Sequence, residues 1–91
     1  MTGAILYGLS AALTGKVTFT NGAADQSNFD NYTILRMRDA PSFDVTIVSS
    51  IADPSGCGEI GTPPVAPAVA NAYFALTGKR VRSLPLLDNL T

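Results

Sequence analysis

The chain contains no histidine and no tryptophan, and it has a single cysteine, Cys57, among its 91 residues. Without histidine, the chain alone cannot form a Ser-His-Asp or Cys-His catalytic arrangement. One cysteine excludes an internal disulfide. A zinc site would have to combine one thiolate with carboxylates, which is a poor match to the usual zinc ligands. We therefore expect no metal site made from the side chains of this chain.

The chain is also poor in charge: 14% of its residues are charged and 46% are hydrophobic, whereas an average soluble domain has about 25% charged residues. Disordered chains are poor in apolar groups, so disorder is excluded. Six basic and seven acidic residues, with a pI of about 4.9, argue against a nucleic-acid-binding surface. A small domain buries little of its surface, so the low charge raises the question of what covers the apolar residues.

Long hydrophobic runs are absent as well. The apolar runs Gly3–Leu13 and Val65–Leu76 are both shorter than the ~20 residues that a membrane-spanning helix needs. The N-terminus lacks the charged segment that opens a secretory signal. These features predict a cytoplasmic protein with no membrane span.

The first third of the sequence predicts a helix followed by a β-hairpin. Apolar residues recur at helical spacings of three and four, and the helix is expected to end at Gly15. The members of this apolar face are Ile5, Leu6, Leu9, Ala12 and Leu13. Lys16–Thr20 alternates as a strand does, and Asn21-Gly22 is a strong hairpin-turn signal. The return strand is expected within Ala24–Asn28.

The rest of the chain predicts a strand, a glycine-rich loop and a second helix. Phe43–Ser49 has Phe43, Val45 and Ile47 on one face, as in a half-buried strand. Ala52–Thr62 contains three glycines and one proline and is expected to be a loop.

Pro63 and Pro64 then open a helix that runs to about Leu76, with Gly78 as its C-terminal cap. The tail Ser83–Thr91 is expected to pack as an extended segment. Residues 1–91 thus form one α+β domain with no internal linker.

Glu59 is the residue with the clearest chemical character, because it is the only glutamate and lies between Gly58 and Gly61. Flanking glycines allow another molecule to approach the backbone closely, and a carboxylate in such a loop can act as a general base. The alternative is structural, because an acidic residue ahead of a helix N-terminus is favoured by the helix dipole.

Two other candidates also have structural alternatives. Cys57 is either a reactive thiol or a buried apolar residue. Arg36 and Arg38 either bind an anion or a partner, or are solvated charges.

The stretch Gly56–Leu84, GCGEIGTPPVAPAVANAYFALTGKRVRSL, resembles the C-terminal end of the molybdenum hydroxylases, the xanthine dehydrogenase and aldehyde oxidase superfamily. The resemblance is strongest to the molybdopterin-binding subunit of the isoquinoline 1-oxidoreductase type. Upstream, GAILYGLSAALTGKVTFTNG resembles the helix and hairpin of that subunit, and QSNFDNYTILRM resembles the segment that follows. Ile60 stands where the family usually has proline.

The resemblance implies that the chain is the C-terminal subdomain of a larger molybdopterin-binding domain and that Glu59 is its general base. Gly58 and Gly61 would let the cofactor, molybdopterin cytosine dinucleotide, approach closely. The implied reaction is hydroxylation of an aldehyde or N-heterocycle, with water as the oxygen source. The implied partners are the remainder of the subunit and an iron–sulfur subunit, and the implied compartments include the periplasm.

Two hypotheses follow for the chain itself. In the first, it is a piece of a molybdenum hydroxylase subunit, inactive alone and competent only with the remainder, which is needed to bind the cofactor. In the second, it is a catalytically inactive module that self-associates through apolar faces. The low charge fits both hypotheses.

Overall fold

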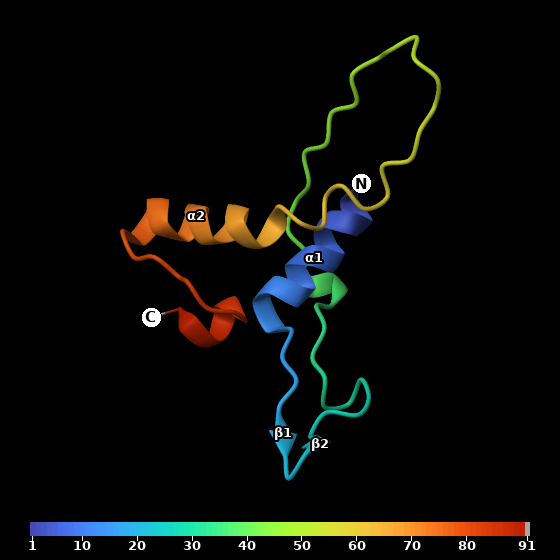
Figure 1. The fold of residues 1–91 in the computed structure, drawn as a ribbon. Helices are drawn as coiled ribbons and strands as arrows, with labels where there is room; N and C mark the ends of the chain where they lie inside the picture. Colours follow the sequence, from blue (N-terminus) through green and yellow to red (C-terminus); the bar gives the residue numbers. More distant parts are fainter. Residues whose placement is uncertain (91) are drawn as a thin grey trace.

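The computed structural model describes residues 1–90 as two helices joined by long irregular segments. The elements in order are α1 (Thr2–Thr14), β1 (Phe19–Thr20), β2 (Ala23–Ala24), the 3-10 turn η1 (Met37–Asp39), α2 (Val65–Thr77) and the 3-10 turn η2 (Leu86–Asn89). Helix α1 lies at the centre, and both α2 and η2 pack against it (Figure 1). Both helices and the hairpin agree with the sequence-based prediction.

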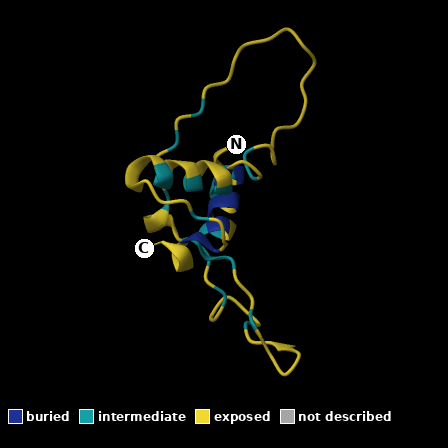
Figure 2. Cartoon of the chain, turned by 60° about the vertical axis from the view of Figure 1, so that its left-hand side comes forward, coloured by how far each residue is buried: buried dark blue, intermediate teal, exposed yellow. Residues whose placement is uncertain are grey.

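The small core is built on α1, and it differs from the predicted apolar face. The buried residues of α1 are Ala4, Gly8, Leu9 and Ala12. Ile5, Leu6 and Leu13, which the spacing placed in the core, are only half-buried. Small residues replace them because they let neighbouring backbone approach the helix closely. Figure 2 shows that burial is concentrated on this helix.

The segment after the hairpin returns along α1 and is fastened to it by hydrogen bonds. The Thr14 hydroxyl lies 3.0 Å from the carbonyl oxygens of both Ser10 and Thr33, and it shares its one proton between them. The Leu35 amide donates to the Ser10 hydroxyl at 3.1 Å. The side chains of Ser10 and Thr14 thus hold residues 33–35 on α1, although these residues form no β-sheet hydrogen bonds.

The hairpin turn forms as predicted, but its strands are short. Asn21 and Gly22 have φ of 52° and 82°, as a type I′ turn requires. Phe19 pairs with Ala24 and Thr20 with Ala23. The return strand therefore begins one residue earlier than predicted and ends at Ala24.

The strand predicted over Phe43–Ser49 does not form: residues 41–57 contain neither helix nor strand. They make up an arc that projects far from the two helices (Figure 1, green to yellow). A strand needs a second strand for its backbone hydrogen bonds, and the part of the chain that the structure describes places none beside these residues.

The second helix matches its prediction closely, whereas the tail does not. Helix α2 begins just after Pro64 and ends at Gly78, which is left-handed with φ of 76°. The tail packs, but as the turn η2 rather than as an extended segment, with Leu86 only 2% exposed and Lys16 3.1 Å from Asp88. Thr91, the last residue of the predicted tail, lies outside the described residues.

No helix within residues 1–90 is long and apolar enough to cross a membrane.

Candidate functional site

The Glu59 loop is fastened to the first two turns of α1. The Thr62 amide donates to the carbonyl oxygen of Glu59 at 2.9 Å, which closes a tight turn. The Thr62 hydroxyl donates to the carbonyl oxygen of Ala4 at 3.0 Å, across a sequence separation of 58 residues. These two bonds hold the loop that carries Glu59 beside the N-terminal end of α1.

Two glycines make this close contact sterically feasible. A Cβ placed on Gly8 would lie 2.6 Å from the carbonyl oxygen of Thr62, and one on Gly61 would lie 2.9 Å from Cγ1 of Ile5. Real Cβ atoms do not make contacts of this length, so any larger residue would push the loop away from α1. Gly61 therefore serves the approach of the loop to α1.

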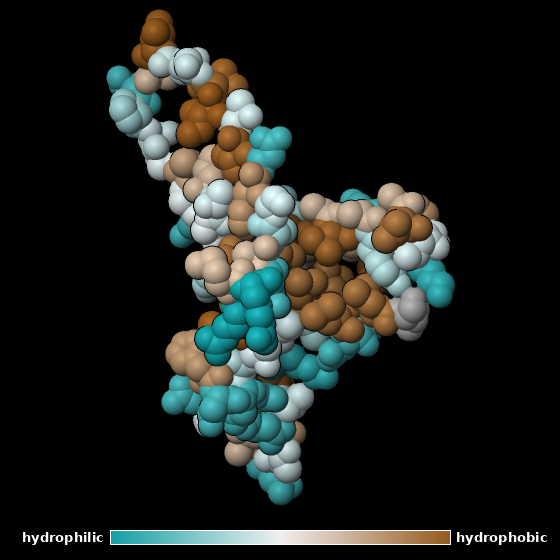
Figure 3. Space-filling model, turned by 180° about the vertical axis from the view of Figure 1, so that it is seen from behind, coloured by the Kyte–Doolittle hydropathy of each residue, from teal (hydrophilic) through white to brown (hydrophobic). Residues whose placement is uncertain are grey.

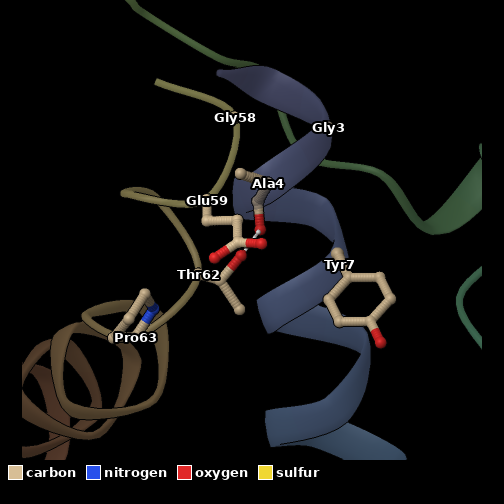
Figure 4. Close-up of a pocket in the computed structure, with 7 residues that line it drawn as sticks. All are labelled: Gly3, Ala4, Tyr7, Gly58, Glu59, Thr62 and Pro63. Carbon is tan, nitrogen blue, oxygen red and sulfur yellow. Dashed lines mark hydrogen bonds between the residues drawn. The ribbon is translucent and has the colours of Figure 1, made fainter. Parts of the chain in front are cut away.

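The contact leaves an open cavity of about 570 Å³ in front of Glu59. Figure 4 shows the carboxylate between the loop and α1, with the ring of Tyr7 across the opening. Its lining residues are Gly3, Ala4, Tyr7, Gly58, Glu59, Thr62 and Pro63. Gly58 has nothing within 4 Å of a Cβ position, so the approach on that side is unobstructed.

The alternative role for Glu59, an acidic residue that only stabilises the N-terminus of α2, gains little support. That helix has no side-chain hydrogen bond at its N-cap and no acidic residue in its first turn. The carboxylate lies instead beside Gly3 and Ala4, in the first turn of α1.

The residues that line this site include one carboxylate and no cationic side chain. Phosphate groups are held by arginine or lysine side chains or by backbone amides, so a phosphate at this site would depend on backbone amides or on groups outside this chain. The small residues Gly3, Ala4 and Gly58 allow a bulky group to approach the carboxylate. The site therefore has room for a bulky group beside the carboxylate and is open on one side.

The other sequence candidates, Cys57, Arg36 and Arg38, do not line this cavity. Cys57 is free and exposed rather than buried. Arg36 and Arg38 are exposed on η1, and Arg38 lies 3.9 Å from the Asp39 carboxylate. Among residues 1–90, no three histidine, cysteine or acidic side chains gather closely enough to hold a metal ion.

Sequence reasoning missed Tyr7 and Thr62, because their place at the site depends on a contact between distant parts of the chain. Gly8 carried a usable signal. A glycine in a helix interior is about 1 kcal/mol less favourable than alanine, so it suggests a close packing contact.

Comparisons with known proteins match nearly the whole chain. It is 38% identical over 86 residues to the beta chain of isoquinoline 1-oxidoreductase from Brevundimonas diminuta, covering 94% of this chain. It is 40% identical over 84 residues to a membrane-bound aldehyde dehydrogenase of Gluconacetobacter polyoxogenes, whose name includes pyrroloquinoline quinone. It is 33% identical over 85 residues to a nicotinate dehydrogenase subunit of Pseudomonas putida.

In each case the chain spans a small part of the relative, 11% of the first two and 7% of the third. No family model matches the chain, and no solved structure matches it. The three matches cover at least 92% of this chain at 33–40% identity. The chain therefore belongs to the oxidoreductase family that includes these isoquinoline 1-oxidoreductase and nicotinate dehydrogenase subunits.

Proposed function

We propose that the chain forms one wall of the active site of a molybdenum-dependent oxidoreductase, in which Glu59 is the general base. The observation that carries the proposal is the placement of the Glu59 carboxylate in an open cavity between its loop and α1. Family membership and the resemblance of the Gly58–Pro64 run to the molybdenum hydroxylases support it. The rest of the subunit would bind the cofactor, for which the cytosine dinucleotide form is proposed.

The substrate class proposed is an aldehyde or an N-heterocycle. The names of the relatives cover both, since they include isoquinoline, nicotinate and aldehyde. When bound, the molybdenum cofactor supplies the two-electron oxidation and delivers an oxygen derived from water.

Within this chain, Glu59 accepts the proton that is released in that step and passes it to solvent through the open face of the cavity. Thr62 and Gly61 keep the loop on α1, which places Glu59 at the cavity. A positioned general base contributes about 10²–10⁴-fold to a rate. The resemblance to the molybdenum hydroxylases is the reason to propose an iron–sulfur subunit as a partner, which would accept the electrons.

The test uses the assembly that the chain forms in its native host, isolated through a tag on the chain. We expect molybdenum in the purified assembly and dye-linked oxidation of an aldehyde or N-heterocycle. Glu59→Gln should lower kcat by about 100-fold or more and leave the molybdenum content unchanged, because the amide has the same shape but cannot accept the proton.

Asp53→Asn is the matched control, since it removes an exposed carboxylate that does not line the cavity. Full turnover by the Glu59→Gln assembly would show that the general-base assignment is wrong. Pyrroloquinoline quinone in place of molybdenum in the purified assembly would overturn the cofactor assignment.

A second candidate, a catalytically inactive module that self-associates, is favoured by the exposed apolar surface. Large apolar side chains at Tyr7, Phe29 and Leu76 are 69–84% exposed, and Figure 3 shows apolar side chains gathered over the body and along the arc. The molecular mass of the isolated chain separates the two candidates. A stable homo-oligomer that recruits no other subunit would favour the module.

A further inference from the structure

The arc between η1 and the Glu59 loop has backbone groups without partners. Within the described chain, no amide or carbonyl group of residues 43–51 forms a backbone–backbone hydrogen bond. The one nearby bond joins the Ala52 amide to the Ser50 hydroxyl at 3.0 Å. Within residues 1–90, no backbone–backbone hydrogen bond therefore holds these residues in their extended course (Figure 1).

The residues of the arc are nevertheless those of a strand. Val45, Ile47 and Val48 have the branched side chains that favour sheets. Ile47 and Val48 are 81% and 83% exposed, and Ile51 is fully exposed. A long exposed segment of this composition, with free amides and carbonyls, is a template for pairing with another strand. Figure 3 shows its apolar side chains extending away from the body.

We infer that residues 43–49 pair, as an added strand, with the edge of a β-sheet. That sheet would belong to the rest of a subunit as long as the relatives, of which this chain is one part. The inference rests on the proposed function, since the same remaining part would bind the cofactor. The matched span of 84–86 residues necessarily includes these positions. In the relatives, the segment thus belongs to a protein about eight to nine times as long as this chain.

The charged residues of the arc limit which side chains can lie opposite it in the partner strand. Residues 42–58 include Asp44 and Asp53 but no lysine or arginine. Directly opposed like charges destabilise a strand pair, so the residue opposite Asp44 is neutral or basic. The face that carries Phe43, Val45 and Ile47 packs on an apolar layer of the partner.

Pairing would also order the active-site loop. Residues 50–57 connect the strand segment to Gly58 and Glu59, and the loop that follows is fixed on α1 through Thr62. With the strand segment paired, both ends of the intervening loop are held. The partner would thereby restrict the positions that the Glu59 carboxylate can adopt.

Amide hydrogen exchange tests the inference on the tagged assembly and on the isolated full chain. In the isolated chain, the amides of residues 43–49 should exchange at the rate of an open chain. In the assembly, alternate amides should be slowed on the order of 100-fold or more, because a strand at a sheet edge bonds every second residue on one side.

Two proline variants identify the bonded edge. Thr46→Pro and Ile47→Pro each remove one amide donor from exposed positions, and consecutive amides of a strand point to opposite edges. One of the two should reduce recovery of the assembly by about 10-fold. Ser55→Pro, in the same arc but outside the strand segment, is the control. The circular dichroism of the isolated variants should match the unmodified chain.

Two outcomes would overturn the inference. In the first, the assembly contains molybdenum and its Glu59→Gln variant loses turnover, but the amides of residues 43–49 are not protected from exchange. The proposed function would then stand and the strand pairing would be wrong. The other is protection that appears with concentration in the isolated chain alone, because the occupant would then be a second copy. Protection in an assembly without molybdenum would support the pairing and contradict the proposed function.

Discussion

At the scale of single residues, the site depends on glycines that have different roles. Gly8 and Gly61 allow the loop and α1 to touch, since a Cβ at either would lie under 3.0 Å from the opposite segment. Gly58 faces open space in the cavity. Gly58 and Gly3, which both line the cavity and have nothing within 4 Å of a Cβ position, leave room there for a molecule from outside the chain.

Gly8→Ala should separate the loop from α1. The added methyl would lie 2.6 Å from a backbone oxygen that cannot rotate away. Overpacking of this kind costs about 1–3 kcal/mol, which offsets the ~1 kcal/mol that alanine gains over glycine within a helix. Thermal unfolding followed by circular dichroism should show a lower Tm than in the unmodified chain.

The control for Gly8→Ala is Gly3→Ala, which lies on the same helix and has nothing within 4 Å of its Cβ position. A higher Tm for both variants would mean that the loop does not rest on α1 at Gly8. Gly58→Ala should leave the Tm of the isolated chain unchanged, because its methyl meets no atom of the chain.

Sequence reasoning could identify Glu59 but not its surroundings. The carboxylate stands out because it is unique in the chain and flanked by glycines. Its neighbours Ala4 and Tyr7 come from the other end of the sequence, and they reach the site through the Thr62–Ala4 hydrogen bond. No local pattern encodes such a contact, and the sequence likewise does not reveal that Gly61 lies against Ile5 of α1. The predicted role of Gly61 beside a cofactor stays a prediction.

At the scale of elements, the hairpin is stabilised at its open end rather than by its strands. The Thr18 hydroxyl donates to the Asp25 carboxylate at 2.6 Å, and the Asp25 amide donates to the carbonyl oxygen of Thr18 at 2.8 Å. Gln26 accepts a further bond from the Thr18 amide at 2.8 Å. These side-chain hydrogen bonds take the place of the backbone hydrogen bonds that longer strands would form.

Thr18→Val should raise the pKa of Asp25. The hydrogen bond from Thr18, followed by that from Thr20, holds this pKa below its ordinary value of 3.8. A lowered pKa means that the ionised carboxylate stabilises the hairpin above pH 3.8, and that this contribution is lost as the pH falls through the lowered value. The pKa is measured by a carbon-13 NMR titration of the Asp25 carboxyl group.

Thr46→Val provides the matched control for that titration, because its hydroxyl lies in the exposed arc and away from Asp25. If the Asp25 pKa is the same in Thr18→Val and in the unmodified chain, the hydroxyl does not bond to the carboxylate. Loss of the hairpin itself would appear in the backbone chemical shifts of Asn21 and Gly22.

Elements with local signals were predicted correctly, and elements that need a distant partner were not. The turn at Asn21-Gly22 and the cap at Gly78 follow from backbone conformations that few residues adopt. The strand over Phe43–Ser49 has the right residues but nothing beside it to bond. The tail was predicted to be extended, yet it forms η2, with Leu86 buried.

At the scale of the whole molecule, the chain is far from compact. Its radius of gyration is 16.1 Å, whereas about 12 Å is expected for a compact domain of this length. Its accessible surface is 7095 Å², against about 5,000 Å² expected for its mass. The excess of about 2,000 Å² is larger than the ~800 Å² that each partner buries in a standard interface.

This open shape predicts a weak response to denaturant. An unfolded chain of this mass exposes about 14,000 Å², so folding buries about a quarter less surface than in a compact domain of the same length. Because the urea m-value scales with the surface exposed on unfolding, it should be smaller by about the same fraction. The m-value is measured by equilibrium urea unfolding followed by circular dichroism. Two low protein concentrations that give the same midpoint show that the value belongs to the monomer. A full-sized m-value would mean that the arc folds back onto the helices in solution, which would leave no free strand to pair with a partner.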